Sequence, residues 1–182
     1  MRLVWQRLER RSGGPETIIV PLGYPFPMRL EINGWASKIT FSATHIIPMH
    51  SKCGRLHGHD YAINAIIEGE VGRDGVIMDF ISVKEFLRSV AAELDHRVLI
   101  PRRDPGVKLK DEYVEYKIGD KKLTIPQCDC IILDIDVASA ETLANFVLER
   151  MLDRVKFPKN VRRIEIGVDE GRGQGAWTGK DL

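Results

Sequence analysis

Segments with the periodicity of strands and of helices alternate along this chain, and their order constrains the fold more than any other feature. Apolar residues recur with the period of a strand over about 29–47, where Asn33-Gly34 is a hairpin-turn signal, and again over 57–70. Over 83–94 the period changes to that of a helix. This half of the chain is therefore predicted to form strands followed by one long helix.

The second half reverses this order, with a helix before the strands. Residues 107–126 are polar and turn at Gly119-Asp120, which predicts an inserted hairpin, and a second helix is predicted to begin near Ser139. Two closing strands are expected over about 161–170 and 174–178. The sequence thus predicts an α+β fold, a four-stranded antiparallel sheet with two helices on one face plus the inserted hairpin.

Length and composition suit one folded domain with an appendage. The chain has 182 residues, of which 43% are hydrophobic, enough for a packed core. Residues 1–28 are predicted to be an N-terminal extension, and 29–182 the domain, with an insertion at about 107–126. Arginines in an apolar context predict that the extension packs on the body or on a partner subunit: Arg2, Arg7, Arg10 and Arg11.

Charge, hydropathy and cysteine content exclude several classes of protein. Lys+Arg is 27 against 26 for Asp+Glu, so no chain-wide nucleic-acid surface is expected. No apolar run approaches the ~20 residues needed to cross a bilayer, and arginines interrupt the N-terminus where a signal peptide needs an apolar core. Three cysteines, with Cys128 and Cys130 one residue apart, form no disulfide framework. We expect a cytoplasmic protein that binds neither membrane nor nucleic acid.

Four of the five histidines lie between His45 and His59. Alternate residues of a strand share a face, so His57 and His59 can reach one ion, and Gly58 leaves room for a neighbouring strand. An antiparallel partner strand would bring His45 alongside His57 and His59. Without His45, these two would be interpreted as surface histidines. Three neutral imidazoles with a vacant fourth position predict a catalytic zinc site, although iron, copper and nickel also accept imidazole.

Cys53 lies four residues before His57, between the cationic residues Lys52 and Arg55. A nearby metal ion and these cations favour the thiolate, which could act as a base or nucleophile. The alternative is that Cys53 is a fourth metal ligand that closes a structural site. His50, in the same loop, is interpreted as incidental.

The dipeptide Asp95-His96 ends the first predicted helix. The helix C-terminus and the aspartate both favour the imidazolium, so this pair is suited to proton transfer. The alternative is a simple capping charge.

Three motifs together resemble the family of 6-pyruvoyltetrahydropterin synthase and 6-carboxytetrahydropterin synthase. They are Phe41-Ser42-Ala43-Thr44-His45, Cys53-Gly54-Arg55-Leu56-His57-Gly58-His59 and Leu94-Asp95-His96. The resemblance implies the tunnelling fold (T-fold), in which subunits form barrels with active sites between them. It also implies a homo-oligomer, a hexamer or another barrel-forming assembly, that uses zinc and 7,8-dihydroneopterin triphosphate.

The resemblance also implies the roles of site residues. The zinc ligands would be His45, His57 and His59. Cys53 would be the general base, and Asp95 with His96 the second proton-transfer unit. Glu170 would hold the amino-pyrimidine edge of the pterin, since a carboxylate can accept two parallel N–H bonds. Ser139 would contact the substrate, but Ala138-Ser139-Ala140-Glu141 departs from the Pro-Thr-x-Glu usual in the family.

The spacing of Cys53 from the His-Gly-His motif distinguishes branches of the family. Only three residues intervene, which resembles the 6-carboxytetrahydropterin synthase branch, the source of the precursor of deazapurine tRNA bases such as queuosine and archaeosine. The alternatives are a 6-pyruvoyltetrahydropterin synthase that releases triphosphate, a cyclohydrolase acting on GTP, and a non-catalytic zinc-stabilised binding module.

Overall fold

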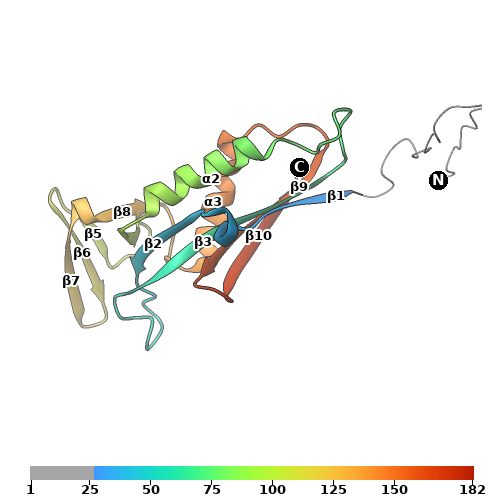
Figure 1. Cartoon of the computed structure of the whole chain (residues 1–182). Coiled ribbons are helices and arrows are strands. Elements are labelled where there is room, and N and C mark those ends of the chain that lie inside the picture. The colour runs from blue at the N-terminus through green and yellow to red at the C-terminus, as the bar shows by residue number, and fades with distance from the viewer. Residues whose placement is uncertain (1–26) are drawn as a thin grey trace, which may run out of the picture.

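Strand β3 (His57–Gly69) is the central strand around which the main sheet is built (Figure 1). The structure is a computed structural model that describes residues 27–182. Strand β3 pairs with strands on both of its edges, and two long helices cover one face of the resulting sheet. The arginine cluster predicted to pack on the body or on a partner lies outside the described residues.

The main sheet has seven strands in the described region, in the order β10-β9-β3-β2-β4-β8, with β1 also paired to β3. Besides β3 they are β1 (Met28–Ile32), β2 (Thr40–His45), β4 (Arg97–Pro101), β8 (Cys130–Leu133), β9 (Val161–Glu170) and β10 (Gly175–Asp181). The closing pair β9 and β10 confirms the two strands predicted near the C-terminus. The predicted four-stranded antiparallel sheet is wrong in two respects, because the sheet has seven strands in the described region and β4 runs parallel to both β2 and β8.

The hairpin predicted at Asn33-Gly34 is wrong. Asn33 instead caps a single helical turn, α1 (Gly34–Ser37), through a 2.9 Å bond from the Ala36 amide to its side chain. The Gly34 amide donates to Oδ1 of the buried Asn64 at 2.8 Å, which fastens the turn to β3. Strands β1 and β2 therefore do not pair with each other. Both pair with β3, one after the other along its length.

Strand β4 was not predicted, because it follows the first helix almost without a connection. His96, immediately before it, has a φ of 56°, a left-handed conformation that reverses the chain within two residues. The His96 amide donates to the Ser42 carbonyl at 2.7 Å and so guides β4 onto the edge of β2.

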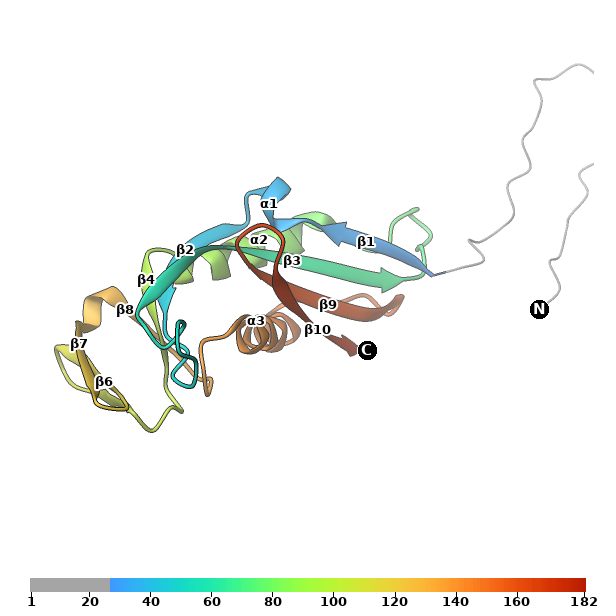
Figure 2. The same cartoon turned by 90° about the horizontal axis from the view of Figure 1, so that it is seen from below.

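The two predicted helices are confirmed as α2 (Phe80–Leu94), capped by Asp79, and α3 (Ala140–Arg154), capped by Ser139. The apolar stripe of α2 is buried throughout: Val83, Phe86, Leu87, Val90, Ala91 and Leu94. Figure 2 shows α3 nearly end-on beside β9 and β10, and buried residues of both helices belong to one core with the sheet. No helix in residues 27–182 is long and apolar enough to cross a membrane.

The hairpin predicted within 107–126 is present as β6 (Tyr113–Ile118) and β7 (Lys121–Pro126). A third strand, β5 (Val107–Leu109), completes a small antiparallel sheet, and a short 3₁₀ turn (Gln127–Asp129) leads into β8. In Figures 1 and 2 this sheet projects from one end of the molecule. Its Tyr116 hydroxyl is buried and donates to Asp104 Oδ2 at 2.6 Å.

Candidate active site

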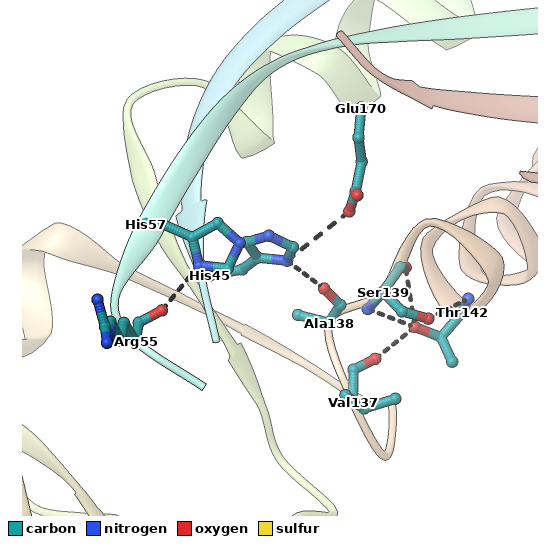
Figure 3. Close-up of polar contacts among 8 residues, drawn as sticks. All are labelled: His45, Arg55, His57, Val137, Ala138, Ser139, Thr142 and Glu170. Carbon is teal, nitrogen blue, oxygen red and sulfur yellow. Dashed lines mark hydrogen bonds and ion pairs between the residues drawn. The ribbon is translucent and has the colours of Figure 1, made fainter. Parts of the chain in front are cut away.

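Three imidazoles converge where β2 and β3 meet (Figure 3 draws two of them). The strand register pairs His45 directly with His57, and His59 lies two residues further on the same face of β3. One ring nitrogen from each of the three lies within 4.8 Å of the others. Gly58 has the predicted role, because a β-carbon there would lie 2.8 Å from the Ala43 carbonyl oxygen.

The hydrogen bonds of these rings prepare them to bind a cation. Nδ1 of His45 lies 2.5 Å from the Ala138 carbonyl oxygen, and Nδ1 of His57 lies 2.7 Å from the Arg55 carbonyl oxygen (Figure 3). A carbonyl can only accept, so in both rings Nδ1 carries the proton and Nε2 keeps its lone pair. Nε2 of His45 is buried and has no partner among residues 27–182. These residues therefore fit a divalent metal ion.

The burial of His45 makes the metal-free protein sensitive to acid. Desolvation lowers the pKa of His45 from 6.5 to about 4. Between these two values the unfolded chain binds a proton at His45 and the folded chain does not. The contribution of neutral His45 to the free energy of unfolding is therefore complete above pH 6.5 and is lost as the pH falls toward 4. We expect a loss on the order of 3 kcal/mol over that range.

Denaturant unfolding of the metal-free protein at several pH values within that range measures this effect. The His45→Asn variant should lack this part of the pH dependence, whereas His50→Gln, a change at an exposed histidine, should keep it. Identical pH profiles for wild type and His45→Asn would contradict the prediction.

A cavity of about 260 Å³ is lined by Cys53, Ser139 and Glu170, and the Glu170 carboxylate lies 3.9 Å from His45. Three of the predicted site residues are thus brought together from a loop, a helix start and a strand end. His50 and Glu141 line the same cavity. The sequence analysis set His50 aside and gave Glu141 no role. Two features of the sequence could have identified them: His50 lies in the same loop as Cys53, and Glu141 lies at the same helix start as Ser139.

The loop that carries Cys53 is held by its own backbone. The Ile47 amide donates to the Cys53 carbonyl at 2.8 Å, and the Gly54 amide donates to the His50 carbonyl at 2.7 Å. A β-carbon on Gly54 would lie 2.4 Å from that His50 oxygen, so the closed loop requires glycine there. Cys53 is not a member of the three-residue ligand cluster in the described region, which leaves its sulfur free.

Glu170, the last residue of β9, brings a carboxylate to the boundary between cavity and imidazoles. Its Oε1 lies 3.9 Å from Nδ1 of His45 (Figure 3). Burial raises the pKa of Glu170 above its ordinary value, and the carboxylate of Glu141 adds to this. Ser139, across the cavity, caps α3 through a reciprocal pair of bonds with Thr142, so its position is tied to the helix start.

Asp95 and His96 are joined to each other but do not line the cavity of Cys53. Asp95 Oδ2 lies 2.8 Å from Nδ1 of His96, and Asp95 Oδ1 accepts the Ser42 amide at 2.8 Å. The Ser42 amide, and to a lesser degree His96, hold the pKa of Asp95 below its ordinary value. The His96 side chain is 83% exposed and opens on a second cavity of about 540 Å³, where His59 also contributes.

A sequence model of one family, 6-pyruvoyl tetrahydropterin synthase, matches residues 36–180. The chain belongs to the 6-pyruvoyl tetrahydropterin synthase family. This confirms the resemblance drawn from the three motifs, and it makes the chain an enzyme, a lyase of this family. The three clustered imidazoles lie inside the matched region.

Relatives in the family extend over nearly the whole described chain. A Methanocaldococcus jannaschii protein, provisionally named a 6-carboxy-5,6,7,8-tetrahydropterin synthase, is 35% identical over 160 residues, 85% of this chain and 98% of that protein. A Pyrococcus abyssi protein with the same provisional name is 33% identical over 71% of this chain and 79% of its own length. A variant of Plasmodium vivax 6-pyruvoyltetrahydropterin synthase shares the fold, with a TM-score of 0.79 at 22% identity over 86% of this chain and 99% of that chain.

Proposed function

We propose that this enzyme is a zinc-dependent lyase that converts 7,8-dihydroneopterin triphosphate to 6-carboxy-5,6,7,8-tetrahydropterin. The observation that carries the proposal is a three-imidazole cluster with an unpartnered Nε2, reached by Glu170, whose cavity Cys53 also lines. A cluster of three imidazoles leaves a coordination position for substrate. The three-residue spacer before His57 and the names of the archaeal relatives support the carboxy-forming branch.

The metal would be held by Nε2 of His45 and by His57 and His59. When bound, zinc supplies Lewis-acid stabilisation of the negative charge that develops on substrate oxygen. The Cys53 thiolate takes a carbon-bound proton from the substrate side chain. Triphosphate leaves, and in the carboxy-forming reaction the side chain is shortened with loss of acetaldehyde.

The pterin ring would be recognised at the far end of the Cys53 cavity. The Glu170 carboxylate accepts two N–H bonds from the amino-pyrimidine edge, a bidentate and charge-assisted contact. Burial favours this use, because a partly desolvated carboxylate gains more from a matched pair of donors than an exposed one. Ser139 would add a polar contact from the start of α3.

The Asp95-His96 pair would serve a site assembled between subunits. The His96 side chain opens on a different cavity from Cys53 and is mostly exposed, which suits proton transfer at the active site of a neighbouring copy. We therefore propose a barrel-forming homo-oligomer in which His96, oriented by Asp95, moves protons on the face of the substrate opposite Cys53.

Incubation with 7,8-dihydroneopterin triphosphate and mass analysis of the product tests the proposal. We expect 6-carboxy-5,6,7,8-tetrahydropterin together with acetaldehyde and triphosphate. A 6-pyruvoyl product without acetaldehyde would assign the chain to the other branch of the family. GTP, offered in parallel, should remain unconsumed.

A further inference from the structure

The hydroxyl of Tyr61 is buried and has no hydrogen-bond partner among residues 27–182. One other buried side-chain polar atom of this region shares that condition, Nε2 of His45, which we assign to the metal. The ring centroids of Tyr61 and His45 lie 5.9 Å apart, so the two residues with unpartnered atoms belong to one cluster of packed rings. Buried polar groups of native proteins nearly always have partners, so an unpartnered hydroxyl next to the His45 and His59 rings points to a partner that is engaged only when a ligand binds.

The Tyr61 ring is held in place on several sides. It stacks on Phe41 with ring centroids 4.7 Å apart and planes 6° from parallel. The rings of His45 and His59 meet it edge-on at 5.9 Å and 5.7 Å. The hydroxyl therefore has a fixed position, and any new hydrogen bond must form by movement of its partner.

The Glu170 side chain is the partner that can move. Tyr61 and Glu170 are opposite each other in the register of β3 and β9, so their side chains share a face of the sheet. The Glu170 carboxylate has no hydrogen bond to another described residue. Its neighbour Nδ1 of His45, 3.9 Å away, donates its proton to the Ala138 carbonyl instead. A neutral phenol is a hydrogen-bond donor and a carboxylate is an acceptor, so the two groups are chemically matched.

We propose that Tyr61 is a positioning residue whose hydroxyl donates a hydrogen bond to the Glu170 carboxylate when pterin is bound. This inference rests on the proposed function, in which Glu170 holds the pterin edge. A carboxylate has about four lone-pair sites, so it can accept the phenol and two pterin N–H groups together. The phenol would set which way the carboxylate faces and leave its two outward lone pairs for the substrate.

The Tyr61→Phe variant, which removes only the hydroxyl, tests this. We expect KM for the triphosphate substrate and Kd for neopterin, a non-reacting pterin, to rise about ten-fold, with zinc content and kcat little changed. Thermal stability should not fall, because no hydrogen bond between described residues is lost. In a Glu170→Gln background the same change should have little further effect, since the residue acts through that carboxylate.

Tyr116→Phe is the matched control, since that tyrosine is equally buried but bonded to Asp104 in the inserted sheet. It should lower the melting temperature and leave KM unchanged. Unchanged pterin affinity in Tyr61→Phe, as expected if a water satisfies the hydroxyl throughout, would overturn the inference. So would an equal loss of affinity with and without Glu170. A wild-type protein that bound no pterin would instead overturn the proposed function, and this inference with it.

Discussion

Replacing Cys53 with alanine is expected to reduce turnover of 7,8-dihydroneopterin triphosphate by a factor of about 10²–10⁴, the usual contribution of a positioned general base. The physical reason is that this residue lines the same cavity as Glu170 and is not one of the three clustered imidazoles. Zinc content should stay near one ion per chain. Turnover by mass-resolved product formation and zinc by elemental analysis measure the two effects separately.

Cys128→Ala is the matched control for that experiment, because Cys128 is exposed and does not line the Cys53 cavity. It should change neither turnover nor zinc content. If Cys53→Ala turned over normally, the base would be another group. If it lost zinc, the sulfur would be a fourth ligand and the site a closed one.

Replacing His57 with alanine should have the other large effect, loss of both metal and activity. Two imidazoles bind the ion less tightly than three. Loss of a group that only hydrogen-bonds to a metal ligand costs up to about 100-fold in metal affinity, so we expect loss of a ligand itself to lower zinc affinity by more than about 100-fold. Turnover should fall in proportion to zinc content. A calorimetric titration of the metal-free variant with zinc measures this affinity directly.

The His50→Ala variant provides the comparison for His57→Ala. His50 lies in the preceding loop and is not one of the clustered ligands, so zinc affinity should be unchanged. Full zinc binding by His57→Ala would mean that the ion sits elsewhere, and the assignment of this cluster as the metal centre would be lost.

The parts of the fold that could be predicted are those decided by local spacing. The stripe of α2 is buried because its apolar residues recur at 3.6-residue spacing, which only a helix brings to one face. The convergence of His45 and His57 followed from two antiparallel strands whose facing ends carry these residues. Glycine, aspartate and serine signals likewise located the turn at Gly119-Asp120 and the start of the second helix near Ser139.

The parts that could not be predicted are decided by contacts between distant residues. Asn33-Gly34 is a good hairpin signal by itself, but the Asn64 side chain and a bond from the Trp35 indole to Asp169 hold the turn in a different shape. Strand β4 is short and begins directly after a helix, so no turn signal precedes it. The convergence of His50, Glu141 and Glu170 on one cavity depends on the assembled sheet.

The bond between His45 and the Ala138 carbonyl has a thermodynamic consequence, because Ala138 also precedes the cap of α3. One carbonyl, 93 residues away in sequence, thus orients an imidazole of the candidate metal site and lies next to Ser139, which lines the Cys53 cavity. A shift of the helix start on pterin binding would turn the ring, and a metal-induced turn of the ring would shift the helix start. Whatever coupling this produces must be reciprocal, so each ligand alters the affinity of the other by the same factor.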